Sequence, residues 1–423
     1  MSELSAPRTR LGGRVIPALL RDTVFRRYWS ASTVSMCGDQ VASVAVPLTA
    51  VLALHAGAAA MGLLTALQWL PSLLFGMHAG AWVDRRGRRR QLMIACDLGR
   101  FALLCIVPVC YALGVLALWQ LLLVIFAAGT LSILFNVADG TLFVSIVAPE
   151  QYMDGQSLIY GSRAMSFVLG PSLGGLLTQL LTAPVAIIAD ALSFLGSALF
   201  LRRIDPAEPP PDSAKGGVTE GLRFIVGSPV VRASLVGVAV INFFNLMFGA
   251  LVLLYAVRVL DVNAGLLGLI LGGGAIGGLL GAAATKPIAD RLGAGMAYVA
   301  GCLAFTMPLT LVPLAPIPHG RGVDPVILLM LFGAEFLSGF GVMMLDFAIG
   351  SIFAAVIPDA IRSRVTGTFT AINYGTRPVG ALLGGLIGSA AGLRPALWIA
   401  VIGGVVGALL LVPSALPRFQ LPG

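Results

Sequence analysis

Charged and histidine residues are scarce in this chain. Of its 423 residues only 11% are charged and three are histidine, whereas 58% are hydrophobic. An ordinary soluble domain carries about 25% charged residues and roughly half apolar ones. A chain this apolar could not cover a water-exposed surface with polar groups, so soluble enzymes, nucleic-acid-binding domains and disordered scaffolds are excluded. The composition indicates a polytopic membrane protein.

Signatures of cofactor and nucleotide binding are also missing. The five cysteines, an odd number, include no Cys-x-x-Cys pair, so neither a zinc site nor a disulfide framework is indicated. The sequence has no Gly-x-x-x-x-Gly-Lys-Ser/Thr phosphate loop, so we expect an ion gradient rather than bound ATP to supply energy. No metal or other cofactor is expected. The formal net charge of +8 does not point to nucleic acid, because aromatic residues are not interleaved with lysine and arginine.

Hydropathy predicts an all-α polytopic membrane protein with twelve transmembrane helices, since each span needs about 20 apolar residues. We expect two pseudo-symmetric six-helix bundles, over 29–201 and 231–415. A cytoplasmic segment (1–28), a proline-rich cytoplasmic linker (202–230) and a cytoplasmic tail (416–423) complete the chain. The predicted spans lie near 29–54, 61–83, 92–114, 117–147, 157–181, 184–201, 231–257, 265–285, 294–316, 326–356, 366–391 and 395–415.

The distribution of basic residues predicts the orientation. With both termini in the cytoplasm, the inner segments hold 21 of the 27 lysines and arginines. The outer loops hold three, and Arg100, Arg163 and Arg377 lie within or at the ends of helices. This bias follows the positive-inside rule, so we expect an integral protein of a bacterial plasma (inner) membrane with both termini cytoplasmic.

The two halves resemble each other in sequence. The Asp-Arg pair at Asp84 recurs at Asp290, an offset of 206, and Gly174-Gly175 recurs at Gly384-Gly385, an offset of 210. Landmarks in the same order at nearly constant spacing indicate an internal duplication. Duplicated halves around a central site are typical of secondary transporters.

A loop motif joins the second and third predicted spans. It consists of Gly80, Asp84, Arg85, Gly87, Arg88 and Arg89, with a fainter copy at Asp290 and Arg291. The glycines permit a tight turn, and the aspartate can cap a helix or pair with an arginine. With this motif the whole chain resembles the major facilitator superfamily, and Phe25 to Trp29 resembles its macrolide-efflux and enterobactin-exporter branch. The resemblance implies that the motif acts as a gate latch between the halves.

A second motif, Gly170, Pro171, Gly174 and Gly175, lies in the fifth predicted span. Proline removes a backbone hydrogen bond and glycine allows close packing, so a kinked helix at a tight contact is expected. The stretch resembles the motif that marks antiporters in the superfamily, which implies export. It also contains a formal Gly-x-Ser-x-Gly, but a nucleophile elbow needs a strand-turn-helix context.

Acidic residues within spans are costly and need an explanation. Asp39, Asp139, Glu335 and Asp346 fall on the first, fourth and tenth spans, which the superfamily architecture places around a central cavity. A carboxylate in a cavity of low dielectric can exchange protons near neutral pH, and Asp39 and Glu335 are the favoured proton-coupling acids. Alternatively, these acids form structural pairs with Arg100, Arg163 or Arg377. Asp190, near the start of the sixth span, is interpreted as structural.

Polar and aromatic residues on the other cavity helices are candidates for substrate contact. Asn242 and Asn245 are three residues apart and therefore share a helix face, and Gln68 and Phe244 join them. The sequence thus predicts a proton-coupled exporter, functional as a monomer, that moves amphipathic small molecules such as drugs, siderophores or secondary metabolites across the lipid bilayer. The alternative is a nutrient-uptake symporter of the same superfamily. A polytopic membrane enzyme is a remote third hypothesis.

Overall fold

A computed structural model describes residues 17–205, 218–318, 324–358 and 361–420 of the chain. Within these ranges the chain forms helices and no strand. The long helices are α1 (Thr23–Leu48), α2 (Ala58–Arg86), α3 (Arg89–Ala112), α4 (Leu118–Ile146), α5 (Tyr152–Leu180), α6 (Ala183–Arg202), α8 (Pro229–Arg258), α9 (Ala264–Leu292), α10 (Ala294–Thr306), α12 (Pro325–Val356), α13 (Arg362–Ala391) and α14 (Leu393–Leu409).

Each predicted span overlaps one of these helices, so the all-helical fold class is confirmed. In the described part of the chain, nine helices are long and apolar enough to cross a membrane. α14 is apolar but shorter, at 17 residues, and α5 and α13 are not among the nine. The count of twelve spans therefore stays a prediction.

Local sequence signals explain several helix starts. The side chain of Asp22 accepts hydrogen bonds from the backbone amides of Val24 and Phe25 and caps α1. Asn263 caps α9 and Asp324 caps α12 in the same way. Because of its cap, α1 begins at Thr23, six residues before the predicted span.

The structure differs from the sequence prediction in two further places. The linker contains a helix, α7 (Val218–Gly227), whereas residues 206–217 lie outside the described part. α7 packs on α13, where Glu220 forms an ion pair with Arg364. The ninth predicted span is interrupted, since α10 is followed by the 3-10 turn η4 (Met307–Thr310) and the short α11 (Leu311–Leu314). Pro308 in η4 cannot continue an α-helical hydrogen-bond ladder.

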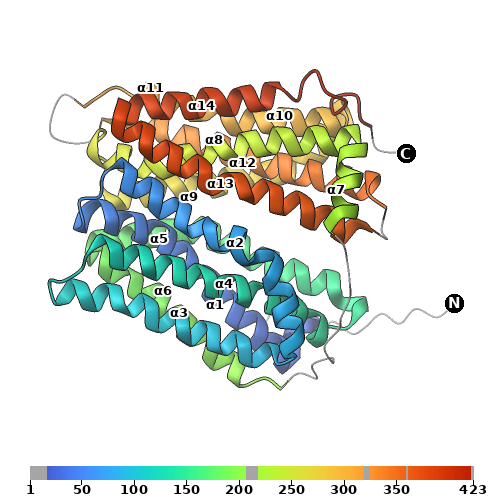
Figure 1. Cartoon of the computed structure of the whole chain (residues 1–423), viewed down its shortest axis with the longest axis horizontal. Helices are drawn as coiled ribbons and strands as arrows, with labels where there is room; N and C mark the ends of the chain where they lie inside the picture. Colours follow the sequence, from blue (N-terminus) through green and yellow to red (C-terminus); the bar gives the residue numbers. More distant parts are fainter. Residues whose placement is uncertain (1–16, 206–217, 319–323, 359–360, 421–423) are drawn as a thin grey trace.

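The helices form two groups, which Figure 1 shows as two layers, one above the other. In the first group, α1 packs on α5 and α6, and α3 packs on α4 and α6. In the second group, α12 packs on α9 and α10, and α8 packs on α13 and α14. The groups meet mainly through α2 with α13 and α5 with α9.

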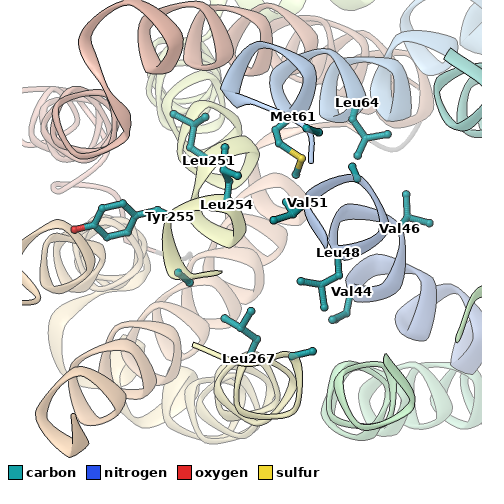
Figure 2. Close-up of a cluster of buried hydrophobic side chains, with 14 of the residues drawn as sticks. Val44, Val46, Leu48, Val51, Met61, Leu64, Leu251, Leu254, Tyr255 and Leu267 are labelled. Carbon is teal, nitrogen blue, oxygen red and sulfur yellow. The ribbon is translucent and has the colours of Figure 1, made fainter. Parts of the chain in front are cut away.

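The two ends of the molecule differ. α7 and the start of α1 lie at one end, which we call the terminal end (Figure 1). The α1–α2 turn lies at the opposite end, the far end. A large buried cluster at the far end combines side chains of α1 and α2 with side chains of α8 and α9 (Figure 2). Buried clusters toward the terminal end are separate: one contains only first-group residues, and two others only residues from the second half of the chain.

Candidate functional site

Two glycine contacts join the groups at the far end. Gly62 of α2 lies against Gly385 of α13, and Gly175 of α5 lies against Gly268 of α9. A Cβ added to Gly385 would lie 2.8 Å from the Ala58 carbonyl oxygen, and one added to Gly175 would lie 2.4 Å from the Ala264 carbonyl oxygen. Only glycine permits backbones to approach this closely. We call these two contacts the glycine seal.

Side-chain hydrogen bonds support the seal. The hydroxyl of Ser389 accepts from the backbone amide of Ala59 at 2.9 Å. The hydroxyl of Ser172 donates to the carbonyl of Gly268 at 3.2 Å. Each bond links the two groups beside one of the glycine contacts, so both helix pairs are held by backbone approach and by a polar contact.

The glycine-rich motif of α5 faces in two directions. A Cβ at Gly170 or Gly174 would clash with Gln40 or Val41 of α1, within the first group. A Cβ at Gly175 would clash with α9 of the second group, and the carbonyl of Pro171 lies against Gly268. The motif therefore sets the position of α5 between its own group and the other one.

A polar and aromatic cluster lies between α2, α8 and α13. The guanidinium of Arg377 lies 4.1 Å from the ring centroids of both Trp69 and Tyr374, and these two rings meet edge to face at 5.4 Å. Arg377 also donates to the Asn242 side chain at 3.2 Å, and Asn242 donates to Asn373 at 3.0 Å. Trp69 belongs to the first group and the other residues to the second, so this seam cluster links the two groups.

The favoured coupling acids lie in different surroundings. Asp39 on α1 is exposed, and among the described residues it forms no hydrogen bond or ion pair. Glu335 on α12 is partly buried, and its carboxyl lies 3.4 Å from the position of a Cβ on Gly274 of α9. Glu335 also lines a small pocket with apolar side chains of α8, α9 and α12. No basic residue of the described chain pairs with it.

The other two acidic candidates have identifiable neighbours. Asp139 of α4 accepts a hydrogen bond of 2.8 Å from the hydroxyl of Tyr28, whose side chain is buried. Asp346 of α12 is exposed and interacts electrostatically with Arg377 without forming an ion pair in the described part. Asp139 thus has a fixed partner, whereas Asp346 is exposed and forms no ion pair in the described part.

Sequence reasoning missed one buried acid. Asp97 on α3 forms an ion pair with Arg100, and their side chains are 0% and 3% exposed. The guanidinium of Arg100 lies 4.0 Å from the Phe194 ring centroid and 4.4 Å from that of Phe135. The spacing of Asp97 and Arg100, three residues on one helix face, was the signal that could have found the pair. Arg163, in contrast, is exposed.

The loop motif surrounds the turn between α2 and α3. α2 ends at Arg86, and Gly87 follows in the left-handed conformation with φ of 63°, which favours glycine. Arg88 is exposed and Arg89 is buried. The side chains of Asp84 and Arg85, and the surroundings of Gly80, lie outside the described part. The two residues of the second copy of the motif, Asp290 and Arg291, are exposed in the last turn of α9.

The remaining cavity candidates are spread over two helices. Gln68 is exposed on α2, and Asn245 is partly buried on α8. Phe244 lies against Gly403 of α14, where a Cβ on the glycine would be 2.3 Å from the ring. Its ring therefore packs inside the second group, and only Asn242 of this set joins the seam cluster.

The sequence matches a known family. A sequence profile described as Major Facilitator Superfamily matches residues 28–334 and 252–420. The chain belongs to the major facilitator superfamily. It is therefore an integral membrane transporter and not an enzyme, and its bacterial relatives indicate a plasma-membrane location.

Two curated relatives cover most of the chain. The multidrug efflux pump Tap of Mycobacterium tuberculosis is 28% identical over 422 residues, 93% of this chain and 92% of the relative. The enterobactin exporter EntS of Escherichia coli is 26% identical over 386 residues, 86% of this chain and 85% of the relative. These names match the exporter branch that the sequence resembles.

Solved structures share the fold at low identity. A bacterial homologue of the iron transporter ferroportin matches with a TM-score of 0.73 and 14% identity, over 94% of this chain and 99% of that one. The nucleoside transporter NupG matches with a TM-score of 0.72 and 12% identity, over 92% of this chain and 98% of that one. At this identity the likeness supports the fold alone.

Proposed function

We propose that this transporter is a proton-coupled exporter of amphipathic small molecules, working by alternating access between two six-helix units. The observation that carries the proposal is the asymmetry of the contacts. The glycine seal and the large buried cluster join the groups at the far end, whereas the buried clusters toward the terminal end remain within one group or the other. A molecule built this way can rock about its seam and expose a central site to one side at a time.

The direction of opening follows from the charge bias. The turn after α2, with Arg88 and Arg89, lies at the terminal end, so we assign that end and both chain termini to the cytoplasm. The glycine seal then closes the outer side, and a substrate enters from the cytoplasm. The loop motif at Gly87 and its copy at Asp290 lie at the cytoplasmic end in this orientation, where they act as the latch of the opposite, outward-open state.

Proton coupling rests on Asp39 and Glu335. A carboxyl held away from water without a basic partner is costly to keep ionised, so a change in its exposure during rocking changes its protonation. Glu335 fits this description on α12, and Asp39 provides an exposed carboxyl on α1. Asp139 and Asp346 are the second pair of candidates. Proton uptake at these acids and substrate release are linked because both depend on the same rocking motion.

The substrate class follows from the seam cluster. Trp69 and Tyr374 offer aromatic surface, while Arg377 and Asn242 offer hydrogen bonds next to it. Gln68 and Asn245 add polar groups on the adjoining helices. Such a mixture suits amphipathic molecules with an apolar body and a few polar groups. The two fused halves provide both walls of the site, so a monomer is sufficient.

Extrusion of ethidium from cells that express the protein tests this function. The wild type is expected to extrude the dye, and a protonophore is expected to abolish extrusion. Glu335→Gln should lose extrusion at an unchanged level of membrane protein, and the exposed acid Glu150 provides the matched control Glu150→Gln. Extrusion that continues with the protonophore would exclude proton coupling. Accumulation of a nutrient instead of extrusion of the dye would favour the uptake symporter.

A further inference from the structure

The first group contains a set of charged residues that the coupling scheme above uses only in part. Its members are Asp39 of α1, Asp97 and Arg100 of α3, and Asp190 of α6. Asp97 and Arg100 form a buried ion pair that is neutral as a whole. The charge of Arg100 is therefore already balanced before Asp190 is considered.

Asp190 is a buried carboxyl with no ion-pair partner in the described part of the chain. Its exposed fraction is 3%. The hydroxyl of Ser193 donates to the backbone carbonyl of Asp190 at 2.7 Å and lies 3.3 Å from its Oδ1 atom. One weak hydrogen bond does not compensate for the lost hydration of a carboxylate. The surroundings of Asp190 therefore favour a carboxylic acid.

Asp190 touches the backbone of α1 immediately beside Asp39. A Cβ on Gly38 would lie 2.6 Å from Oδ1 of Asp190 and 2.0 Å from the hydroxyl of Ser193. The glycine thus allows the buried carboxyl of α6 to reach α1. Its neighbour in sequence, Asp39, is exposed. A buried carboxyl and an exposed one therefore lie on adjoining helices next to the same contact.

The charges around Asp190 come from two helices. Asp39 of α1 and Arg100 of α3 interact with it electrostatically, and Asp97 is one turn before Arg100 on α3. α5 and η2 (Thr49–Ala53) also pack on α6, and no charged group from their described residues interacts with Asp190. In the described part of the chain the buried Nε of Arg100 has no hydrogen-bond partner, and Asp97 interacts with Ser197 of α6 as well as with Arg100. Not every hydrogen-bonding group of this polar network has a partner, so protons can be redistributed within it.

We propose that Asp190 is the proton-binding residue of the first group and that Asp39 connects it to water. Asp39 takes a proton from water and becomes a carboxylic acid, then passes the proton to the carboxylate of Asp190 and becomes a carboxylate again. Proton release follows the reverse order, from Asp190 to Asp39 and then to water. Arg100 is held by Asp97 and by the rings of Phe135 and Phe194, so the neutral ion pair keeps a fixed position beside both acids. This inference rests on the proposed proton coupling and assigns the proton to a residue outside the central site.

Transport by purified protein in lipid vesicles tests the assignment, with ethidium as the probe. Two rates are measured, namely ethidium exchange without a pH gradient and ethidium accumulation driven by one. Asp190→Asn is expected to reduce driven accumulation to the level seen without a gradient while ethidium exchange continues. Glu150→Gln, which neutralises an exposed acid, is the control and should leave both rates unchanged. Gly38→Ala, which displaces the carboxyl without removing it, should also lower driven accumulation.

The outcomes separate this inference from the proposed function. If the wild type exchanges ethidium but does not respond to the gradient, proton coupling is wrong and the role of Asp190 falls with it. If the wild type responds and Asp190→Asn responds equally, Asp190 carries no proton and only this inference is overturned. If Asp190→Asn loses exchange and driven accumulation together, its role is structural, which also overturns the inference. If Asp190→Asn does not fold, the result for Gly38→Ala decides in the same way.

Discussion

The glycine seal offers the sharpest test of the rocking scheme. In Gly175→Ala, the new Cβ would lie 2.4 Å from the Ala264 carbonyl oxygen and 2.8 Å from the Cα of Gly268. Ordinary contact requires about 3.5 Å, so α5 and α9 must separate by roughly 1 Å. Neither obstacle is a flexible side chain, because both atoms belong to the backbone of α9. The far-end-closed state should therefore be destabilised relative to a state in which α5 and α9 have separated.

Overpacking of this kind costs about 1–3 kcal/mol, which changes a two-state equilibrium about 5- to 150-fold. A reporter on the other half of the seal distinguishes opening of the whole far end from local distortion. Ala58 of α2 is 8% exposed and lies against Gly385 of α13. We expect a cysteine introduced by Ala58→Cys to react slowly with a maleimide in a background without the native cysteines. Adding Gly175→Ala should accelerate the reaction about fivefold or more.

The same helix provides a matched control. No atom of the described residues lies within 4 Å of a Cβ added to Gly161 of α5, so Gly161→Ala should leave the labelling rate at Ala58→Cys unchanged. Purified protein in detergent suffices, since the assay does not depend on the orientation in the membrane. Equal labelling with and without Gly175→Ala would refute the argument that the α5–α9 contact seals the far end. Acceleration by Gly161→Ala as well would show a general loss of stability instead.

Two further predictions follow from the buried contacts. Asp97→Asn leaves the buried guanidinium of Arg100 without its charged partner, so it should lower the free energy of unfolding by about 3–5 kcal/mol. Chemical or thermal unfolding measures this change. An unfolding midpoint equal to that of the wild type would show that the ion pair is dispensable for stability. Trp69→Ala removes a cation–π contact worth about 0.5–2 kcal/mol between the groups, so it should accelerate labelling at Ala58→Cys by at least about twofold. Tyr160→Ala is the control. The Tyr160 ring lies 5.9 Å from the exposed Arg163 within one group, so this substitution should leave the labelling rate unchanged.

Much of the fold followed from the sequence because each membrane helix satisfies its own backbone hydrogen bonds. Apolar runs therefore locate the helices, and residues such as Asp22 and Asn263 fix their starts through local capping. Prediction was weaker where a helix is short and amphipathic. α7 falls in a stretch that its prolines and charges marked as linker, and it is held there by packing on α13.

The candidate site was predictable only in part. Individual acids are visible in the sequence because they interrupt apolar runs, and Asp39, Asp139 and Glu335 were found in this way. Their partners were not visible, since the Tyr28–Asp139 hydrogen bond joins residues 111 positions apart. Asp97 was overlooked although its partner Arg100 is only three residues away.

The sequence by itself determined that the chain is an all-helical membrane transporter of the major facilitator superfamily, because composition, hydropathy and local motifs are properties of single segments. The tertiary structure decided which end of the molecule is sealed. It also decided that Gly170 and Gly174 face α1 while Gly175 faces α9, and that Asp190 reaches α1 at Gly38. Such facts depend on the distances between helices remote in sequence, and these distances are set by how all the helices pack together.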